Sequence, residues 1–211
     1  MKARFPGSRG DRRHQRLPSR SVINGQRRWL LGGGIGSGKS AVRVLLERSG
    51  VETIDADSIG HEVLEPDGAA FADVAKRWPA AVVEGRIDRT SLANMVFGDK
   101  VELAALEEIT HPYIFGTIQR SVQRIDGVVV VEVPVLQTGI ESGWRRIVVD
   151  CDDQSRLMRL IERGMTSADA RSRMRTQPTR SEWLATADLV VPNHGYLDEL
   201  TATVEKLRVW L

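Results

Sequence analysis

The stretch GGGIGSGKSA, residues 32–41, contains the pattern G-x-x-x-x-G-K-[ST] from Gly33 to Ser40. Glycines permit backbone angles that turn successive N–H groups toward one point, and such a set of donors binds phosphate. In loops of this kind the lysine reaches the β- and γ-phosphates of a nucleotide, and the following hydroxyl binds Mg²⁺. We therefore predict that Lys39 neutralises phosphate charge and that Ser40 binds the metal. The residues predicted to contact the nucleotide are Gly33, Gly34, Ile35, Gly36, Ser37, Gly38, Lys39, Ser40 and Ala41.

Two carboxylates follow the next predicted strand and help to identify the reaction, since phosphate loops also occur in switches, motors and synthetases. Asp55 and Asp57 come at the end of VETID and just after it. Ligands of open parallel sheets gather beyond the carboxyl ends of the strands, where a kinase needs a carboxylate to accept a proton or to hold Mg²⁺ through water. The alternative is that one of the two caps the next helix, which suits Asp55 better than Asp57. A guanine-reading N-K-x-D segment is absent, which disfavours a GTPase.

An arginine-rich segment, RLMRLIERGMTSADARSRMRTQPTR, covers residues 156–180. Its first arginines share one side of a helix, and Thr166 or Ser167 can cap a second helix that carries further arginines. A mobile basic hairpin of this type closes over a transferring phosphoryl group and excludes water, which predicts a lid over about residues 163–178. The alternative is a solvated helix pair with ion pairs such as Asp169 with Arg173.

Strands alternate with helices along the rest of the chain. The hydropathy pattern predicts strands at residues 29–31, 51–55, 128–133, 146–151 and 188–191. It predicts helices at residues 40–48, 58–65, 71–78, 90–97, 100–109, 112–125 and 155–163, and a last helix from residue 196. This alternation predicts an α/β fold of three layers, α/β/α, with a parallel sheet.

Composition restricts the class of protein further. The chain has 211 residues, of which 41% are hydrophobic, and a single cysteine, Cys151, so it forms no internal disulfide. It contains no apolar run long enough to span a bilayer, and we expect a cytoplasmic enzyme.

Residues 1–28 contain nine Lys and Arg and a single acidic residue, Asp11. This composition predicts a disordered basic extension, and we expect the folded kinase domain to cover residues 29–211. A nucleic-acid-binding arm, a transit-like segment and an upstream start-codon artefact remain alternatives for this extension.

Taken in order, several segments resemble the dephospho-coenzyme A kinase family, which phosphorylates the ribose 3′-hydroxyl of dephospho-CoA with ATP. The resemblance runs from about Leu30 to the C-terminus and rests on GGIGSGKS, IDADSIGHEVLEPDGAA, ITHPYI, VVVVEVPVL, RGMTSADARSRM and ADLVVPNHG. It implies a P-loop kinase fold with a helical acceptor-binding region and an arginine-rich lid. It also implies ATP and Mg²⁺ as cofactors.

The resemblance also assigns roles to individual residues. Asp57 falls at the position of the family's proposed catalytic base, and Arg159 at that of a transition-state arginine. Asn193 and Gly195 belong to an ending that borders the adenine end of ATP. Contacts to the acceptor are implied for His111, Pro134, Val135 and Leu136. We expect a monomer that acts on this small molecule, without a membrane or nucleic-acid partner.

Departures from the family pattern concentrate in the acceptor half. The Pro-Leu-Leu-Phe/Val-Glu run reads Pro134-Val135-Leu136-Gln137-Thr138 here, Gly32 replaces a threonine before the phosphate loop, and Ala41 replaces another after Gly-Lys-Ser. Losing one methylene weakens an apolar contact by about 0.8 kcal/mol, a fewfold effect. Two alternatives therefore stay open: a related kinase for another nucleoside or metabolite hydroxyl, and an ATP-binding protein of low activity.

Overall fold

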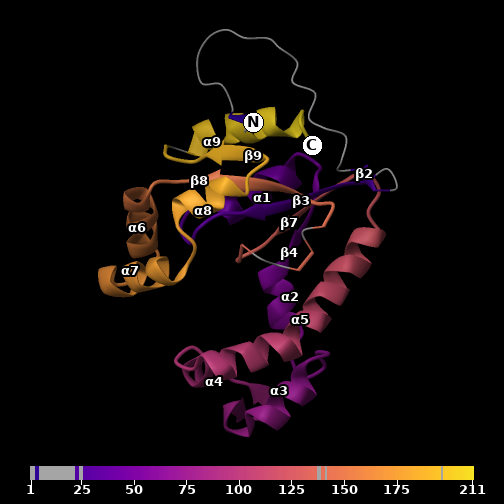
Figure 1. The fold of residues 1–211 in the computed structure, drawn as a ribbon, viewed down its shortest axis with the longest axis vertical. Coiled ribbons are helices and arrows are strands. Elements are labelled where there is room, and N and C mark those ends of the chain that lie inside the picture. Colours follow the sequence, from indigo (N-terminus) through magenta and orange to yellow (C-terminus); the bar gives the residue numbers. More distant parts are fainter. Residues whose placement is uncertain (1–2, 5–21, 24–25, 137–138, 141, 196) are drawn as a thin grey trace. The chain divides into compact units, whose positions relative to one another are not determined.

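The computed structural model describes residues 3–4, 22–23, 26–136, 139–140, 142–195 and 197–211 (Figure 1). The chain divides into two compact units. Unit 1 comprises residues 1–54 and 125–211, and unit 2 comprises residues 55–124. The phosphate loop, defined here as residues 33–40, and the arginine-rich segment both belong to unit 1.

A mostly parallel sheet forms the centre of unit 1. Its strands lie in the order β1 (Ala3–Arg4), β9 (Leu189–Pro192), β8 (Arg145–Asp150), β3 (Gln26–Gly32), β7 (Val128–Glu132) and β4 (Glu52–Asp55). The short β2 (Val22–Ile23) pairs antiparallel with the start of β3. Strand β3 pairs in parallel with both β7 and β8, so the phosphate loop emerges at the middle of the sheet. β7 is fully buried beyond its first residue, as its uninterrupted run of valines predicts.

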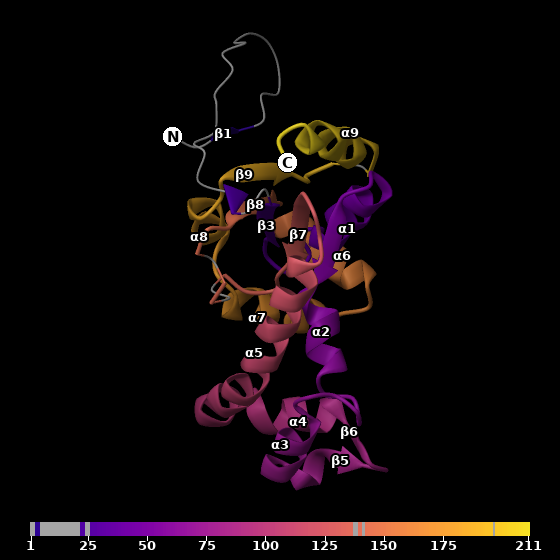
Figure 2. The same cartoon turned by 90° about the vertical axis from the view of Figure 1, so that its right-hand side faces the viewer.

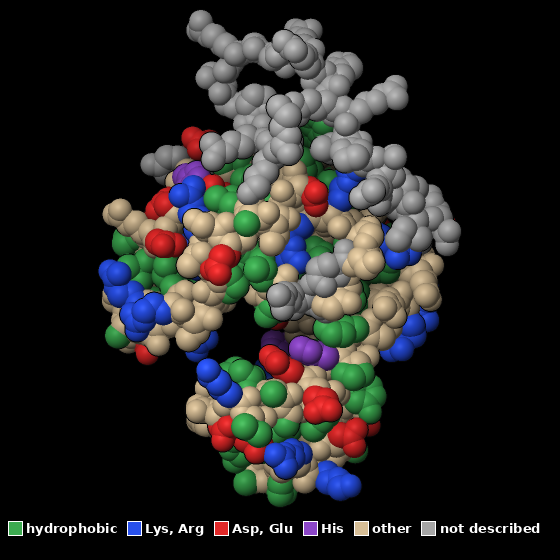
Figure 3. Space-filling view, in the orientation of Figure 1, with side chains coloured by type: hydrophobic (Ala, Val, Ile, Leu, Met, Phe, Trp, Pro, Cys, Tyr) green, Lys and Arg blue, Asp and Glu red, His purple; other side chains and the backbone are tan. Residues whose placement is uncertain are grey.

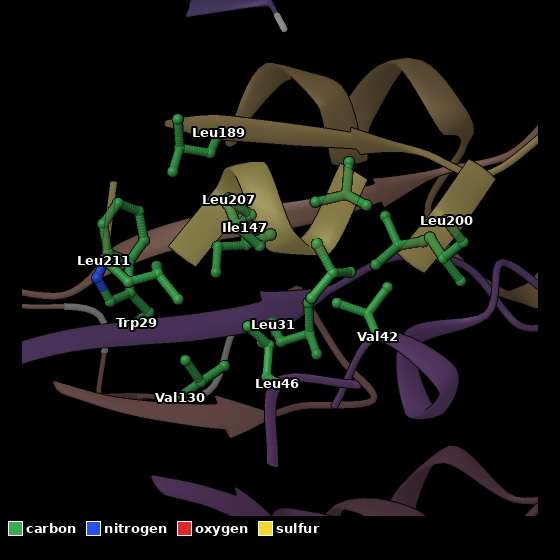
Figure 4. Close-up of a cluster of buried hydrophobic side chains, with 13 residues drawn as sticks. Trp29, Leu31, Val42, Leu46, Val130, Ile147, Leu189, Leu200, Leu207 and Leu211 are labelled. Atoms are coloured by element: carbon green, nitrogen blue, oxygen red, sulfur yellow. The ribbon is translucent and has the colours of Figure 1, made fainter. Parts of the chain in front are cut away.

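The main core lies on one face of this sheet. Figure 2 shows α1 (Lys39–Arg48) and α9 (Leu197–Arg208) on one side of the sheet and α8 (Arg180–Ala185) on the other. The residues on the first side include alternate positions of β3, β8 and β9, because successive strand residues point to opposite faces. Figure 4 shows this cluster, which consists of Trp29, Leu31, Val42, Leu46, Val130, Ile147, Val149, Leu189, Val191, Leu200, Val204, Leu207 and Leu211.

Local capping sets the starts of the remaining helices of unit 1. Asp152 caps α6 (Asp153–Glu162), and Thr166 caps α7 (Ser167–Thr176), which decides between the two caps considered from the sequence. Thr179 begins α8 with a reciprocal capping box to Glu182. The hydropathy pattern did not reveal α8, a helix of six residues.

Unit 2 is a small helical unit with one hairpin. It contains α2 (Ala56–Glu62), α3 (Phe71–Arg77), the 3₁₀ turn Pro79–Ala81, β5 (Val82–Val83), β6 (Arg86–Ile87), α4 (Arg89–Val96) and α5 (Lys100–Gln123). A tight turn at Glu84-Gly85 joins β5 to β6, with φ of 49° and 74°. Its buried side chains include Ile59, Val63, Val74, Trp78, Leu92, Val96, Ile118 and Val122.

Two sequence-based boundaries need correction. Helix α5 runs unbroken through Pro112, where we predicted separate helices at 100–109 and 112–125. Proline removes one backbone hydrogen bond, but buried residues on both sides of it, Thr110 and Ile118, keep the helix packed. Strand β3 begins at Gln26, before the predicted start at Trp29, because Arg27 and Arg28 pair with β7 and leave no hydropathy signal.

Part of the predicted N-terminal extension is described. Residues 3–4, 22–23 and 26–28 are strand residues, and the rest of residues 1–28 lies outside the described residues. Among the helices that the structure describes, none has the length and apolar character needed to cross a membrane.

Candidate active site

The phosphate loop connects the buried end of β3 directly to the first turn of α1. Gly33, Gly36 and Gly38 have φ values of 147°, 78° and 97°. Gly38 is the N-cap of α1 and has no side chain to cap it, so the first N–H groups of the helix are available to a bound anion. This is the strand, loop and helix arrangement that the sequence motif predicts.

The two functional side chains of the loop have defined partners. Lys39 Nζ donates to the carbonyl oxygen of Gly33 at 3.0 Å, which keeps the ammonium over the loop. Ser40 Oγ donates to Glu132 Oε1 at 2.8 Å. Glu132 ends β7, is only 7% exposed, and its second oxygen accepts from Arg43 Nε at 2.9 Å. A hydroxyl and a carboxylate side by side are hard oxygen ligands of the kind that Mg²⁺ prefers, so these residues fit that ion.

Glu132 was not among the candidate residues from the sequence. It lies far along the chain from Ser40, and only the sheet brings the two together, since β7 is hydrogen-bonded to β3. The available signal was an acidic residue at the end of the run VVVVE, because a charge that ends a buried strand faces the ligand edge of a parallel sheet.

Two other segments hold the backbone of the phosphate loop. The Ile35 N–H donates to Gln177 Oε1 at 2.7 Å, and Arg156 Nε donates to the Ile35 carbonyl at 2.8 Å. Asn193 Nδ2 donates to the Ser37 carbonyl at 2.7 Å. One N–H and two carbonyl groups of the loop are thus engaged, so the arginine-rich segment and the residue after β9 fix the conformation of the loop.

Arg159 lies in the same network. Its guanidinium donates to the carbonyl oxygens of Ser37 and Asn193, at 3.2 and 3.1 Å, and to Asn193 Oδ1 at 3.3 Å. In this structure, therefore, Arg159 and Asn193 brace the phosphate loop together. The sequence placed them in separate roles, one at the transferring group and one near adenine.

A substitution at Gly38 tests the close packing of this loop. A Cβ at Gly38 would overlap Asn193 Nδ2, and the left-handed φ of 97° is unfavourable for any other residue. We expect Gly38→Ala to lower the free energy of unfolding by about 1–3 kcal/mol and to weaken ATP binding, as measured by chemical denaturation and nucleotide titration.

Gly50→Ala is the matched control, because Gly50 has a similar φ of 82° but no atom within 4 Å of its added Cβ. Gly50→Ala should lower the free energy of unfolding through backbone strain and leave the affinity for ATP unchanged. Equal effects of the two substitutions on ATP affinity would contradict the packing argument.

A basic cavity of about 630 Å³ lies among α6, α7 and α8. Its lining includes four arginines, one acidic residue and an apolar part, namely Arg156, Arg171, Arg175, Arg180, Asp153, Leu157, Met174 and Pro178. Asp153 pairs with Arg156 at 2.9 Å. Within the described part of the chain, Arg171 and Arg175 form no ion pair, and the Asp169 carboxylate accepts from the Thr166 hydroxyl instead of pairing with Arg173. Figure 3 shows Lys and Arg side chains gathered over α7, at the left of the view. Like charges one helical turn apart repel each other, so this lining favours an anionic ligand.

Asp150, the last residue of β8, binds Arg180, one of the arginines that line this cavity. Arg180 donates to both of its carboxylate oxygens, at 2.6 and 2.8 Å. The bonds from Arg180 hold the pKa of Asp150 below its usual value, although burial opposes this. Asp150 is therefore ionised at neutral pH and anchors the start of α8.

A second, more open hollow of about 700 Å³ borders Arg159. Its lining includes Asp152, Ser155, Met158, Arg159, His194 and Gly195. Gly195 thus lines a space of suitable size for a ligand, while the neighbouring Asn193 is buried and bonded to the phosphate loop. Hydrogen bonds from Ser155, which begin α6, lower the pKa of Asp152.

Cys151, Asp152 and His194 place one possible metal ligand each within a small space. His194 Nδ1 lies 3.3 Å from Asp152 Oδ2, but Arg159 Nη1 donates to Cys151 Sγ at 3.4 Å. Burial raises the pKa of the Cys151 thiol, so sulfur is in its neutral form there. The Arg159 guanidinium is therefore the cationic neighbour of this sulfur, and Cys151, at 2% exposed, fits a small buried residue that fills space.

Asp55 and Asp57 take different positions in unit 2. Asp55 is the N-cap of α2 and accepts from the backbone N–H groups of Asp57 and Ser58, at 3.0 and 3.3 Å. The capping alternative is therefore confirmed for Asp55. Asp57 lies in the first turn of α2 with an exposed side chain.

The predicted acceptor residues are divided between the two units. In unit 2, His111 is half-buried within α5 and its ring contacts Phe115, with centroids 5.0 Å apart. In unit 1, Pro134, Val135 and Leu136 follow β7, and Val135 is 47% exposed. Gln137 and Thr138, which carry the departure from the family pattern, lie outside the described residues.

Comparisons with known proteins agree with this geometry. A family model described as dephospho-CoA kinase matches residues 30–199. A dephospho-CoA kinase of Streptomyces avermitilis is 40% identical over 182 residues, which cover 82% of this chain and 88% of that one. A dephospho-CoA kinase of Chromobacterium violaceum is 39% identical over 185 residues, with 83% and 89% covered.

Solved structures give the same fold. The crystal structure of TT1252 from Thermus thermophilus matches with a TM-score of 0.78 and 30% identity, over 87% of this chain and 96% of that one. A dephospho-CoA kinase from Campylobacter jejuni matches with a TM-score of 0.60 over 86% and 95% of the two chains. At 24% identity, this second match supports the fold alone.

Proposed function

Because the chain belongs to the dephospho-CoA kinase family, we propose that it transfers the γ-phosphoryl group of ATP to the ribose 3′-hydroxyl of dephospho-CoA. The product is coenzyme A, and the reaction is the last step of its synthesis. The observation that carries the chemistry is the contact of Ser40 with Glu132 beside Lys39 at the end of the glycine loop. Together these side chains provide a cation, a hydroxyl and a carboxylate around a phosphate-binding backbone.

The phosphate loop supplies most of the transition-state stabilisation in this proposal. Its inward N–H groups and the start of α1 bind the phosphates of ATP, and Lys39 neutralises charge that develops on the transferring group. Ser40 and Glu132 are the residues that would hold Mg²⁺, which would neutralise part of the phosphate charge of ATP. Transfer then proceeds by positioning and electrostatics, and no covalent enzyme intermediate is needed.

The arginine-rich segment takes the role of a lid in this proposal, over about residues 163–178. Arg171 and Arg175 line the basic cavity that Arg156 joins to the phosphate loop, so an anion in this cavity is next to the loop backbone. Closure over bound substrates would exclude water and thereby prevent hydrolysis of ATP. Arg159, held at Ser37 and Asn193, would steady the transferring group.

Asp57 is proposed as the general base that accepts the proton of the 3′-hydroxyl. Two points support this role: its match to the family position of the base, and its exposed carboxylate in the first turn of α2. Asp55 is engaged in capping that helix, which leaves Asp57 as the better candidate of the pair. His111, Pro134, Val135 and Leu136 are proposed to contact the acceptor. Gly195 is proposed to border the adenine end of ATP, in a protein that acts as a cytoplasmic monomer.

The test is an assay of ADP release with Mg·ATP and dephospho-CoA, with coenzyme A identified by mass. We expect robust turnover at micromolar acceptor. Tight ATP binding without formation of coenzyme A would contradict the proposed acceptor, and nucleosides would then be tested in the same assay.

A further inference from the structure

Arg146 is a buried arginine within the central sheet and outside the chemistry described so far. It is the second residue of β8 and is 6% exposed. It pairs in register with Leu30 of β3, whereas its strand neighbour Ile147 pairs with Leu31 and joins the main core. The Arg146 side chain therefore lies on the opposite face of the sheet, which α8 covers. A buried cation in a strand is costly unless polar partners compensate for it.

The Arg146 guanidinium contacts the predicted acceptor segment. Its Nη2 donates to the carbonyl oxygen of Leu136 at 2.7 Å. Leu136 follows β7 in the run Pro134-Val135-Leu136, which resembles the family segment that contacts coenzyme A. A hydrogen bond from a charged donor is roughly twice as strong as a neutral one, so it fixes the backbone at this position.

Trp183 and Gly32 hold Arg146 in this place. The Trp183 ring, 2% exposed, lies with its centroid 6.0 Å from the Arg146 guanidinium carbon. A Cβ at Gly32 would lie 2.6 Å from Trp183 Cζ3, so the ring fits only because residue 32 has no side chain. Asp188 fixes the backbone of Arg146, because its Oδ2 accepts from the Arg146 N–H at 2.8 Å.

These contacts join two departures from the family pattern that are far apart in the sequence. Gly32, where the family has threonine, provides the space for Trp183, and Trp183 lies against the arginine that holds the altered acceptor segment. We propose that Arg146 is a positioning residue for the acceptor: through the Leu136 carbonyl it holds Pro134–Leu136 in the conformation that receives dephospho-CoA. The inference rests on the proposed function and adds the residue that determines the shape of that acceptor contact.

The test compares the acceptor with ATP in the variant Arg146→Met. Methionine fills similar volume without a donor, and thermal unfolding verifies that the variant is folded. We expect KM for dephospho-CoA to rise roughly tenfold, while KM for ATP changes less than twofold. Arg146→Lys keeps the charge and a donor and should recover part of the loss.

The matched control is Arg145→Met, the same substitution one residue earlier in β8. Arg145 lies over the Trp29 ring, at 5.4 Å from its centroid, and thus belongs to the opposite face of the sheet. This variant should leave both KM values unchanged. An equal rise of the two KM values in Arg146→Met would show a merely structural role and would overturn the proposal.

Hydrogen–deuterium exchange separates this inference from the proposed function. In Arg146→Met, peptides that contain Leu136 should exchange faster, while peptides of the phosphate loop should keep their wild-type rates. Unchanged exchange around Leu136 overturns the positioning role whichever acceptor the enzyme uses. Absence of coenzyme A formation by the wild-type protein would count against the proposed function alone, and the exchange rates would still decide the role of Arg146.

Discussion

Lys39→Met should reduce kcat/KM for ATP by about 10³-fold, a loss of about 4 kcal/mol of transition-state stabilisation. Lys39 is the charged side chain of the phosphate loop, and its Nζ already lies 3.0 Å from the Gly33 carbonyl at the start of that loop. Methionine keeps the length of the side chain but provides neither the charge nor the donor. Steady-state kinetics with both substrates measure the effect, and thermal unfolding verifies that the variant is folded.

Lys206→Met is the control for this substitution. Lys206 is an exposed residue in the last turn of α9, on the helix that packs behind the sheet. Its replacement removes the same charge from the protein and should leave kcat/KM within twofold of wild type. A loss of less than tenfold in Lys39→Met would mean that other groups neutralise the phosphates.

Local patterns sufficed to predict the phosphate loop, because a strand, a glycine-rich turn and a helix that are adjacent in sequence make the whole feature. The alternation of strands and helices likewise predicted the layered parallel sheet. The predicted break at Pro112 was wrong because it relied on a local signal alone. A proline gives a strong local signal, whereas the packing that keeps α5 continuous comes from residues distant in the chain.

Contacts between distant segments could not be predicted from the sequence. The pairing of Ser40 with Glu132 depends on β7 lying beside β3. The bonds from Asn193 and Arg159 to Ser37 depend on β9 and α6 converging on the same loop. In both cases the residue types indicated that the side chains could take part in the site. The partner of each side chain, however, depends on the order of the strands in the sheet.

These contacts have a consequence for function. The Ile35 and Ser37 carbonyls of the phosphate loop accept hydrogen bonds from Arg156, Arg159 and Asn193, so the loop backbone is held in place before any nucleotide binds. Preorganised donors of this kind cost no reorganisation during transfer. A substitution in the arginine-rich segment should therefore affect ATP binding in two ways, by altering the loop backbone and by removing charge near the phosphates.

Asp57→Asn should leave ATP affinity nearly unchanged and lower kcat by about 10²-fold or more, the effect of losing a general base. Asparagine has the same shape as aspartate but does not accept a proton at neutral pH. The measurement is kcat with saturating ATP and dephospho-CoA, together with nucleotide titration.

Asp55→Asn is the matched control, because asparagine is also a good N-cap and can keep the bonds to Asp57 and Ser58. It should retain turnover within a few-fold of wild type. The reverse result, a large loss in Asp55→Asn with normal turnover in Asp57→Asn, would transfer the role of base to the capping residue.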